Sequence, residues 1–187
     1  MKKLFSLASD IQSLCVENNW DFCFIGGIAL QRWGEPRLTL DVDISILTGF
    51  GNEEKFIEVL MNRYKERMSG ARDFALQNRV LLLQSEDNIA LDIIFAALPF
   101  EEQVIVRASE YEFLEGIVLK TCSAEDLVVY KAFADRLRDW ADVESIVQRQ
   151  DDNLDWNYIK ENLSPLAEMK EDADIMNKLE NIKNKNI

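Results

Sequence analysis

Two aspartates interrupt an apolar strand pattern early in the chain. Residues 39–47, TLDVDISIL, alternate along their length and are rich in β-branched side chains, which predicts a β-strand. Residues two positions apart in a strand point to the same face, so Asp41 and Asp43 project together while Val42 and Ile44 point the other way. Two unpaired carboxylates are costly to bury and repel each other. The strand therefore requires either an open face or a cation beside the acids.

Asp92 repeats the pattern in a second apolar segment. Residues 89–98, IALDIIFAAL, are too apolar for a solvated strand, yet they carry one acid in the middle. If the two strands are neighbours, the three acids could converge on one or two Mg²⁺ ions, as two-metal phosphoryl transfer requires. The alternative is that Asp41 and Asp43 lie on an open sheet face and that Asp92 caps a helix or pairs with an arginine.

A glycine pair precedes the two aspartates. Gly26 and Gly27 follow a short apolar strand, DFCFI, and precede a helix of about two turns, IALQRWG. A strand-to-helix turn of this kind presents main-chain N–H groups and a positive helix end, which together form a phosphate-binding seat. The same pair would also serve an ordinary tight turn.

The remaining patterns predict an α+β fold of mixed α/β type, a mixed sheet flanked by helices with a C-terminal helical region. Helices are predicted at residues 4–18, 52–68, 123–148 and 156–164, a hairpin at 79–98 and two short strands at 111–120. The segment 99–108 is compatible with either a helix or a strand, and the polar tail 177–187 is expected to fray. The domain boundary is expected near Thr121, between residues 1–121 and 122–187.

Composition excludes several classes of chemistry. The 187-residue chain contains no histidine, which removes Ser-His triads and the usual zinc sites. Its three cysteines form no Cys-x-x-Cys pair, and no signal peptide or membrane-length apolar run is found, so a cytoplasmic protein without a membrane partner is expected. A formal net charge of −13 argues against a broad nucleic-acid groove. Carboxylates, lysine and arginine remain for catalysis, and carboxylates with an oxygen-binding cation such as Mg²⁺ are the obvious chemistry in that set.

The stretch 24–46, FIGGIALQRWGEPRLTLDVDISI, resembles the signature of the nucleotidyltransferase superfamily that includes DNA polymerase β. It is most similar to the subgroup of abortive-infection and type IV toxin–antitoxin nucleotidyltransferases, whose R-x-T-x-D-x-D form is matched by Arg37, Thr39, Asp41 and Asp43. Asp92 in LDIIF matches the third carboxylate of the family. A later stretch is similar to the family's C-terminal motif, at Lys131, Arg138, Asp139 and Asp142.

The resemblance implies a role for each matched residue. Asp41 and Asp43 would bind Mg²⁺, and Asp92 would be the general base or a further metal ligand. The nucleotide would be held by the glycine pair and by the other matched polar residues: Gly26, Gly27, Arg37, Thr39 and Lys131. Two alternatives stay open. Arg37 could instead pair with an acid such as Asp92, and Lys131 could lie on a solvated helix face with Asp135, Arg138 and Asp142.

The function implied by the resemblance is Mg²⁺-dependent transfer of a nucleoside monophosphate from an NTP such as ATP to a hydroxyl, with release of pyrophosphate. The expected acceptor is a tRNA or a protein, and an antitoxin protein is an expected partner. One rival is an antibiotic-type enzyme with a small cationic acceptor, which would suit an acidic surface. The other is a catalytically silent module that binds a nucleotide or a partner protein.

Overall fold

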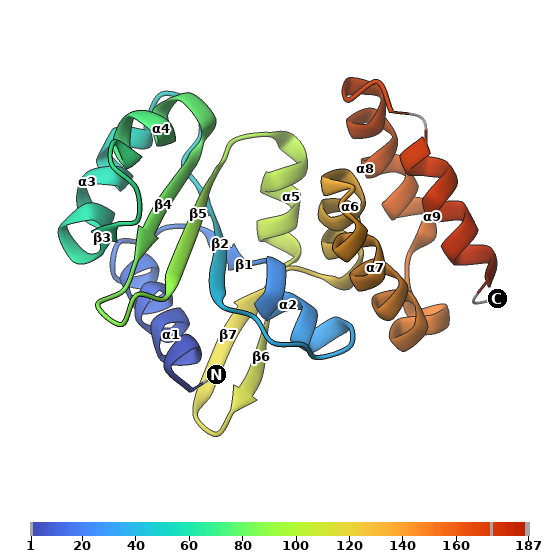
Figure 1. Ribbon diagram of the computed structural model, residues 1–187, viewed down its shortest axis with the longest axis horizontal. Helices are drawn as coiled ribbons and strands as arrows, with labels where there is room; N and C mark the ends of the chain where they lie inside the picture. Colours follow the sequence, from blue (N-terminus) through green and yellow to red (C-terminus); the bar gives the residue numbers. More distant parts are fainter. Residues whose placement is uncertain (1, 173, 186–187) are drawn as a thin grey trace. The chain divides into compact units, whose positions relative to one another are not determined.

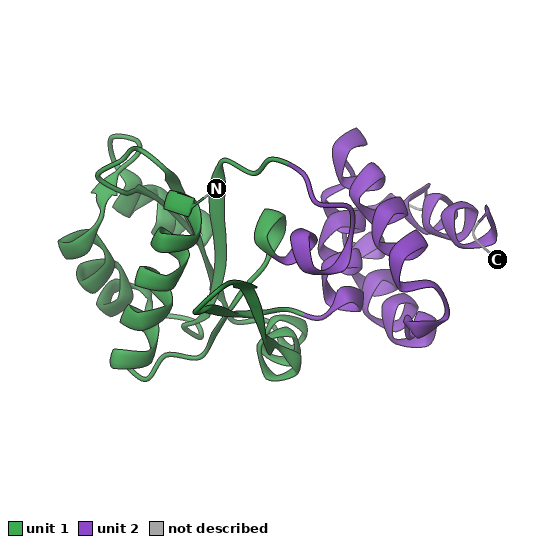
Figure 2. Ribbon diagram, turned by 90° about the horizontal axis from the view of Figure 1, so that it is seen from below, with its two compact units in different colours: residues 1–28, 38–122 green, residues 29–37, 123–187 purple. Residues whose placement is uncertain are grey.

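The computed structural model describes residues 2–172 and 174–185, and the chain forms two compact units. The first unit comprises residues 1–28 and 38–122, and the second comprises residues 29–37 and 123–187 (Figure 2). Residues 29–37, which the sequence-based boundary assigns to the first domain, thus pack with the C-terminal helices. The helix α2 (Gly26–Trp33) begins in the first unit and ends in the second.

A seven-stranded mixed sheet forms the centre of the first unit, in the order β3-β4-β5-β2-β1-β7-β6 (Figure 1). Its strands are β1 (Phe22–Phe24), β2 (Asp41–Leu47), β3 (Lys65–Glu66), β4 (Val80–Gln84), β5 (Ala90–Ala96), β6 (Ser109–Leu114) and β7 (Ile117–Thr121). Its helices, besides the start of α2, are α1 (Lys2–Glu17), α3 (Glu53–Arg63), α4 (Ala71–Asn78) and α5 (Pro99–Arg107). The β2–β5 and β1–β7 pairs are parallel and the other neighbouring pairs are antiparallel. The expected mixed sheet with flanking helices is confirmed.

The two faces of this sheet have different chemistry. One face is fully apolar and packs with α1, α3 and α4 into a single core, as the alternating pattern of β2 and β5 requires. Its central strands contribute Val42, Ile44, Ile46, Leu91, Ile93 and Phe95, all 0% exposed. The opposite face carries the three aspartates and is only partly covered, with α5 packing on β1 and β2. The alternative in which Asp41 and Asp43 lie on an open face therefore describes this side of the sheet.

Helices alone make up the second unit, which contains the end of α2 together with α6 (Ala124–Ala134), α7 (Leu137–Gln150), α8 (Trp156–Met169) and α9 (Asp174–Lys185). A 3₁₀ turn, Asp151–Asn153, links α7 to α8. Residues Leu127, Val143, Ile159, Leu163 and Leu179 are buried and form part of its interior.

Four helix boundaries differ from the sequence-based prediction. The helix predicted over 52–68 ends at Arg63, and Lys65–Glu66 form the strand β3. The single helix predicted over 123–148 is wrong, because Asp135 adopts a left-handed conformation with φ of 57° and ends α6. The stop predicted near Pro165 is also wrong, since α8 continues through the proline to Met169. Residues 177–185 of the tail expected to fray belong to α9, because Leu179, and Ile175 just before the tail, are fully buried. Residues 186–187 of that tail lie outside the described residues.

Other local predictions resolve more simply. Ser123 caps α6, with its side chain accepting a hydrogen bond from the Asp126 amide at 3.2 Å. The segment left open at 99–108 is the helix α5, and its N-terminus is fastened by Glu101, which accepts hydrogen bonds from the amides of Ala97 and Leu98. Over residues 2–172 and 174–185, no helix combines the length and the apolar character needed to cross a bilayer.

Candidate active site

Strand register gathers the three aspartates on the open face of the sheet. In the parallel β2–β5 pair, Asp43 lies directly opposite Asp92, and Asp41 lies two residues before Asp43 on the same face. The expectation that the two acidic strands are neighbours is therefore confirmed. Ser45, the next residue on this face, is 0% exposed, so the acids stand at the open end of a surface that becomes buried along β2.

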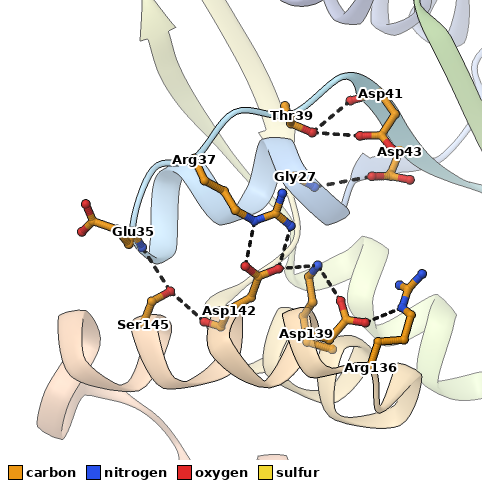
Figure 3. A network of polar contacts seen from close by, with 11 residues as sticks. Gly27, Glu35, Arg37, Thr39, Asp41, Asp43, Arg136, Asp139, Asp142 and Ser145 are labelled. Atoms are coloured by element: carbon orange, nitrogen blue, oxygen red, sulfur yellow. Dashed lines mark hydrogen bonds and ion pairs between the residues drawn. The ribbon is translucent and has the colours of Figure 1, made fainter.

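Each of the three carboxylates contacts a different group. The Thr39 hydroxyl donates to Oδ1 of Asp41 at 2.9 Å, and the Gly27 amide donates a long hydrogen bond of 3.4 Å to Oδ2 of Asp43 (Figure 3). Arg67 donates to Oδ1 of Asp92 at 2.5 Å. The alternative in which Asp92 pairs with an arginine therefore holds for this structure, and the arginine is one that no sequence motif marks.

The three carboxylates suit a hard divalent cation as ligands, although their oxygens do not converge on one point. Mg²⁺ takes oxygen ligands, and carboxylates at Asp43 and Asp92 are adjacent in the register. Within the described residues, however, no three acidic, histidine or cysteine side chains converge closely enough to hold a metal ion. The cause is visible in the contacts, because each carboxylate turns toward its own partner. The residues fit Mg²⁺ in the chemistry of their oxygen ligands and in the register that places Asp43 opposite Asp92.

Burial raises the pKa of Asp92 above its ordinary value. The hydrogen bond and charge of Arg67 oppose this rise, while the neighbouring negative charge of Asp41 adds to it. A carboxylate with a raised pKa is a better proton acceptor than an ordinary surface acid. The interaction with Asp41 also shows that the acids of β2 and β5 are electrostatically coupled.

The glycine pair lets the start of α2 approach the acidic strand. Gly26 has a φ of +57°, and a Cβ atom there would lie 2.0 Å from Oδ2 of Asp43. A Cβ atom on Gly27 would lie 2.1 Å from Oγ1 of Thr39. Only glycine fits both positions, so the main-chain N–H groups at the N-terminus of α2 lie directly beside Asp43 and Thr39.

Arg37 and Lys131 meet at Asp142 in the second unit. Arg37 donates from Nε and Nη2 to the two oxygens of Asp142, both at 2.8 Å, and Nζ of Lys131 lies 2.8 Å from Oδ2 of the same carboxylate (Figure 3). Lys131 also donates to Asp139 at 2.9 Å. The acid that binds Arg37 is therefore Asp142, whereas the sequence suggested an acid such as Asp92.

This ion-pair network is buried. Lys131 is 8% exposed and Asp142 is 4% exposed, so the interpretation of a solvated helix face is wrong for these two residues, whereas Arg138 is exposed. Burial alone would raise the pKa of Asp142, but the hydrogen bonds and charges of Arg37 and Lys131 outweigh it and hold that pKa below its ordinary value. Nearby, the backbone of residues 33–35 is fastened to α7 by Ser145, Arg149 and Gln150.

Sequence comparison identifies the family. Residues 15–182 match the family of AbiEii nucleotidyl transferase toxins of type IV toxin–antitoxin systems. The chain belongs to the AbiEii nucleotidyltransferase family. The superfamily resemblance read from the motifs is thus confirmed, and the protein is a nucleotidyltransferase. A search of curated proteins gave no match.

Solved structures share the fold of this AbiEii-family protein at low sequence identity. An antigenic nucleotidyltransferase-like protein from Paracoccidioides brasiliensis is 15% identical, with 96% of this chain and 93% of that chain covered and a TM-score of 0.54. ANT(2″)-Ia in complex with adenylyl-2″-tobramycin is 16% identical, with 89% and 98% covered and a TM-score of 0.56. The lincosamide antibiotic adenylyltransferase LnuA, bound to lincomycin, is 17% identical, with 73% and 91% covered and a TM-score of 0.50.

Arg67 is the site residue that sequence reasoning missed in this AbiEii-family protein. It lies one residue beyond β3, in a polar stretch, KERMSGAR, that carries no motif. Its amide donates to the Leu82 carbonyl at 3.1 Å, and this bond extends the β3–β4 ladder by one step. The signal that could have found Arg67 is the pairing of β3 with β4, and a strand of two residues leaves no such pattern in the sequence.

Gly26→Ala tests the close approach of the glycine turn to Asp43. We expect a loss of about 1–2 kcal/mol from the left-handed backbone and about 1–3 kcal/mol more from overpacking, together with an activity loss on the order of 10²-fold as Asp43 is displaced. Gly116→Ala is the matched control, because Gly116 has a φ of +77° but nothing within 4 Å of its added Cβ. Urea denaturation and initial rates measure both effects, and equal losses in the two variants would contradict the close approach.

Proposed function

We propose that this AbiEii-family enzyme transfers a nucleoside monophosphate from an NTP to an acceptor hydroxyl, with Mg²⁺ held by Asp41, Asp43 and Asp92. The observation that carries the proposal is the register that sets Asp43 beside Asp92, with Asp41 on the same face and the N-terminus of α2 alongside. Acids gathered in this way on one partly open face repel one another, and a bound cation turns that repulsion into binding.

The reaction divides among the residues of the open face. Asp92 accepts the proton of the acceptor hydroxyl as its oxygen bonds to the α-phosphorus, and the α–β phosphoanhydride bond breaks so that pyrophosphate leaves. The Gly26 and Gly27 amides and the Thr39 hydroxyl bind phosphate oxygens at the end of α2. When bound, Mg²⁺ would supply charge neutralisation of the phosphates and of the leaving pyrophosphate.

Arg37 and Lys131 are the remaining residues of the proposed nucleotide-binding set, and both already have acidic partners. Both are ion-paired with Asp142, and Lys131 is also ion-paired with Asp139. A direct contact with phosphate would require these cations to share their hydrogen bonds with those acids. The Arg37 side chain is 27% exposed and that of Lys131 is 10% exposed, so we propose that Arg37 is the more available of the two for a contact with phosphate.

The proposed acceptor is a hydroxyl of a tRNA or of a protein. The support is the description of the family as type IV toxins, which also implies an antitoxin partner. A small cationic acceptor is the second candidate, because the net charge is −13 and the fold is shared with antibiotic adenylyltransferases such as ANT(2″)-Ia and LnuA. The three cysteines are buried, in keeping with the cytoplasmic location that we propose.

Label transfer distinguishes these acceptors. The enzyme is incubated with each α-³²P-labelled NTP and Mg²⁺ in parallel with deacylated tRNA, with a protein extract, and with an aminoglycoside and a lincosamide. We expect label on tRNA or protein that depends on Mg²⁺ and disappears with Asp41→Asn. Label only on an antibiotic would favour the small-molecule candidate. No label on any acceptor, together with no NTP binding by calorimetry in the presence of Mg²⁺, would favour the silent module.

A further inference from the structure

Arg67 belongs to a row of residues that crosses the open face of the sheet. The register pairs Leu82 of β4 with Asp92 of β5, and Asp92 with Asp43 of β2. Because the Arg67 amide bonds to the Leu82 carbonyl, Arg67 continues this row at the edge of the sheet. Paired residues in neighbouring strands point to the same face, so the arginine and the acids share one surface.

The guanidinium of Arg67 reaches past Leu82 to Asp92. It donates from Nη2 to Oδ1 of Asp92 at 2.5 Å, and the two side chains are 34% and 24% exposed. The other arginines near this part of the sheet are engaged elsewhere: Arg63 with Asp10, Arg72 with Glu54, and Arg79 with Glu53 and the Phe95 carbonyl. Of these four arginines, Arg67 is the one whose described ion pair is with an acid of the open face.

We propose that Arg67 is a positioning residue that competes with the divalent cation for Asp92. In the protein without nucleotide, the guanidinium holds the Asp92 carboxylate and keeps positive charge where a metal ion would bind. Asp41 and Asp43 then bind a metal ion without help from Asp92. An incoming triphosphate offers Arg67 a second anionic partner and frees Asp92, so full metal binding follows nucleotide binding.

The physical basis is repulsion between like charges at short range. A guanidinium in contact with one oxygen of a carboxylate lies within a few ångströms of any cation that binds the other oxygen, and in a partly buried site this repulsion is only partly screened. Removal of the arginine charge should therefore strengthen metal binding, whereas removal of a residue with a purely structural role should weaken it or leave it unchanged. The inference rests on the proposed metal site of Asp41, Asp43 and Asp92.

Manganese titration followed by electron paramagnetic resonance tests the competition without an activity assay. Mn²⁺ alone, with no nucleotide, is titrated into wild type and Arg67→Gln. We expect Arg67→Gln to bind Mn²⁺ about tenfold more tightly, because one unit of positive charge has been removed beside the site. Arg72→Gln is the matched control, since Arg72 pairs with Glu54 on the protein surface, and it should bind as wild type does.

Asp92 completes a double-mutant cycle with Arg67. Asp92→Asn alone should change Mn²⁺ affinity by less than about twofold, because Arg67 already withholds that carboxylate, whereas Asp92→Asn added to Arg67→Gln should remove the tenfold gain. An unchanged or weaker affinity of Arg67→Gln, or a gain that survives Asp92→Asn, would overturn the role of Arg67 and leave the metal site standing. If Arg67→Gln does not fold, a more than twofold loss in Asp92→Asn alone overturns the proposal.

A failure of the proposed metal site gives a different pattern. If Mn²⁺ binds neither wild type nor Arg67→Gln, or binds Asp41→Asn as well as wild type, the site of three acids is itself refuted and this inference fails with it. Arg67→Lys keeps the positive charge that repels the cation, although lysine lacks the planar fork of the guanidinium. Its Mn²⁺ affinity should therefore stay within about threefold of wild type.

Discussion

Asp43→Asn is expected to reduce kcat by about 10³-fold or more while the folded protein keeps its stability. The amide keeps the shape of the side chain and an oxygen that can accept the hydrogen bond from Gly27, so the turn at the start of α2 is preserved. In the proposed Mg²⁺ site, the lost negative charge would remove metal-dependent stabilisation of the transferring phosphoryl group, which is worth several kcal/mol. Asp41→Asn should behave alike, since Asp41 shares the face.

The same variants should lose activity without losing stability. Asp41, Asp43 and Asp92 repel one another, so each Asn substitution should leave the free energy of unfolding without metal unchanged or raise it by up to about 1 kcal/mol. Asp73→Asn, at an exposed position of α4, is the control and should keep full activity. Initial rates and urea denaturation without Mg²⁺ measure the two effects. Activity within tenfold of wild type would contradict a metal-binding role for these acids.

The acidic strands were predictable because their pattern is local. Alternation in residues 39–47 fixes which side chains share a face, and an acid within an apolar run, as at Asp92, is a recognisable anomaly. β2 and β5 pair because both strands bury their apolar faces in the same core. The sequence therefore contained the three carboxylates of the candidate site and the face that they share.

The partners of those carboxylates were not predictable in the same way. Arg67 reaches Asp92 through a two-residue strand at the sheet edge, and Arg37 reaches Asp142 across 105 residues of sequence. Both contacts depend on how separate elements pack, and helical spacing alone placed Lys131 and Asp142 on an outer stripe. In the structure, Lys131 and Asp142 are instead buried. The break at Asp135 also escaped prediction, because the described partners of its side chain, Trp140 and Lys178, lie on other helices.

The largest expected effect on stability is from Asp142→Ala. Asp142 accepts two hydrogen bonds from Arg37 and lies 2.8 Å from the Lys131 ammonium, in a site where its side chain is only 5% exposed. Removing this acid takes away both hydrogen bonds that Arg37 donates to it and leaves Lys131 with Asp139 as its described partner. Breaking a buried ion pair from one side costs about 3–5 kcal/mol. Urea denaturation should show this loss in the free energy of unfolding.

Two comparisons distinguish the loss of the Asp142 ion pairs from the general effect of a mutation in α7 on the free energy of unfolding. Glu144→Ala, two residues further along that helix and less buried, should change the free energy of unfolding by no more than about 0.5 kcal/mol. In wild type, the pKa of Asp142 is lowered on folding, so its contribution is fully present above the unfolded pKa of about 3.9 and is lost as the pH falls through the folded pKa. The stability difference between wild type and Asp142→Asn should therefore shrink below about pH 4. A difference that stays constant between pH 7 and pH 3 would show that shape, and not charge, is what Asp142 contributes.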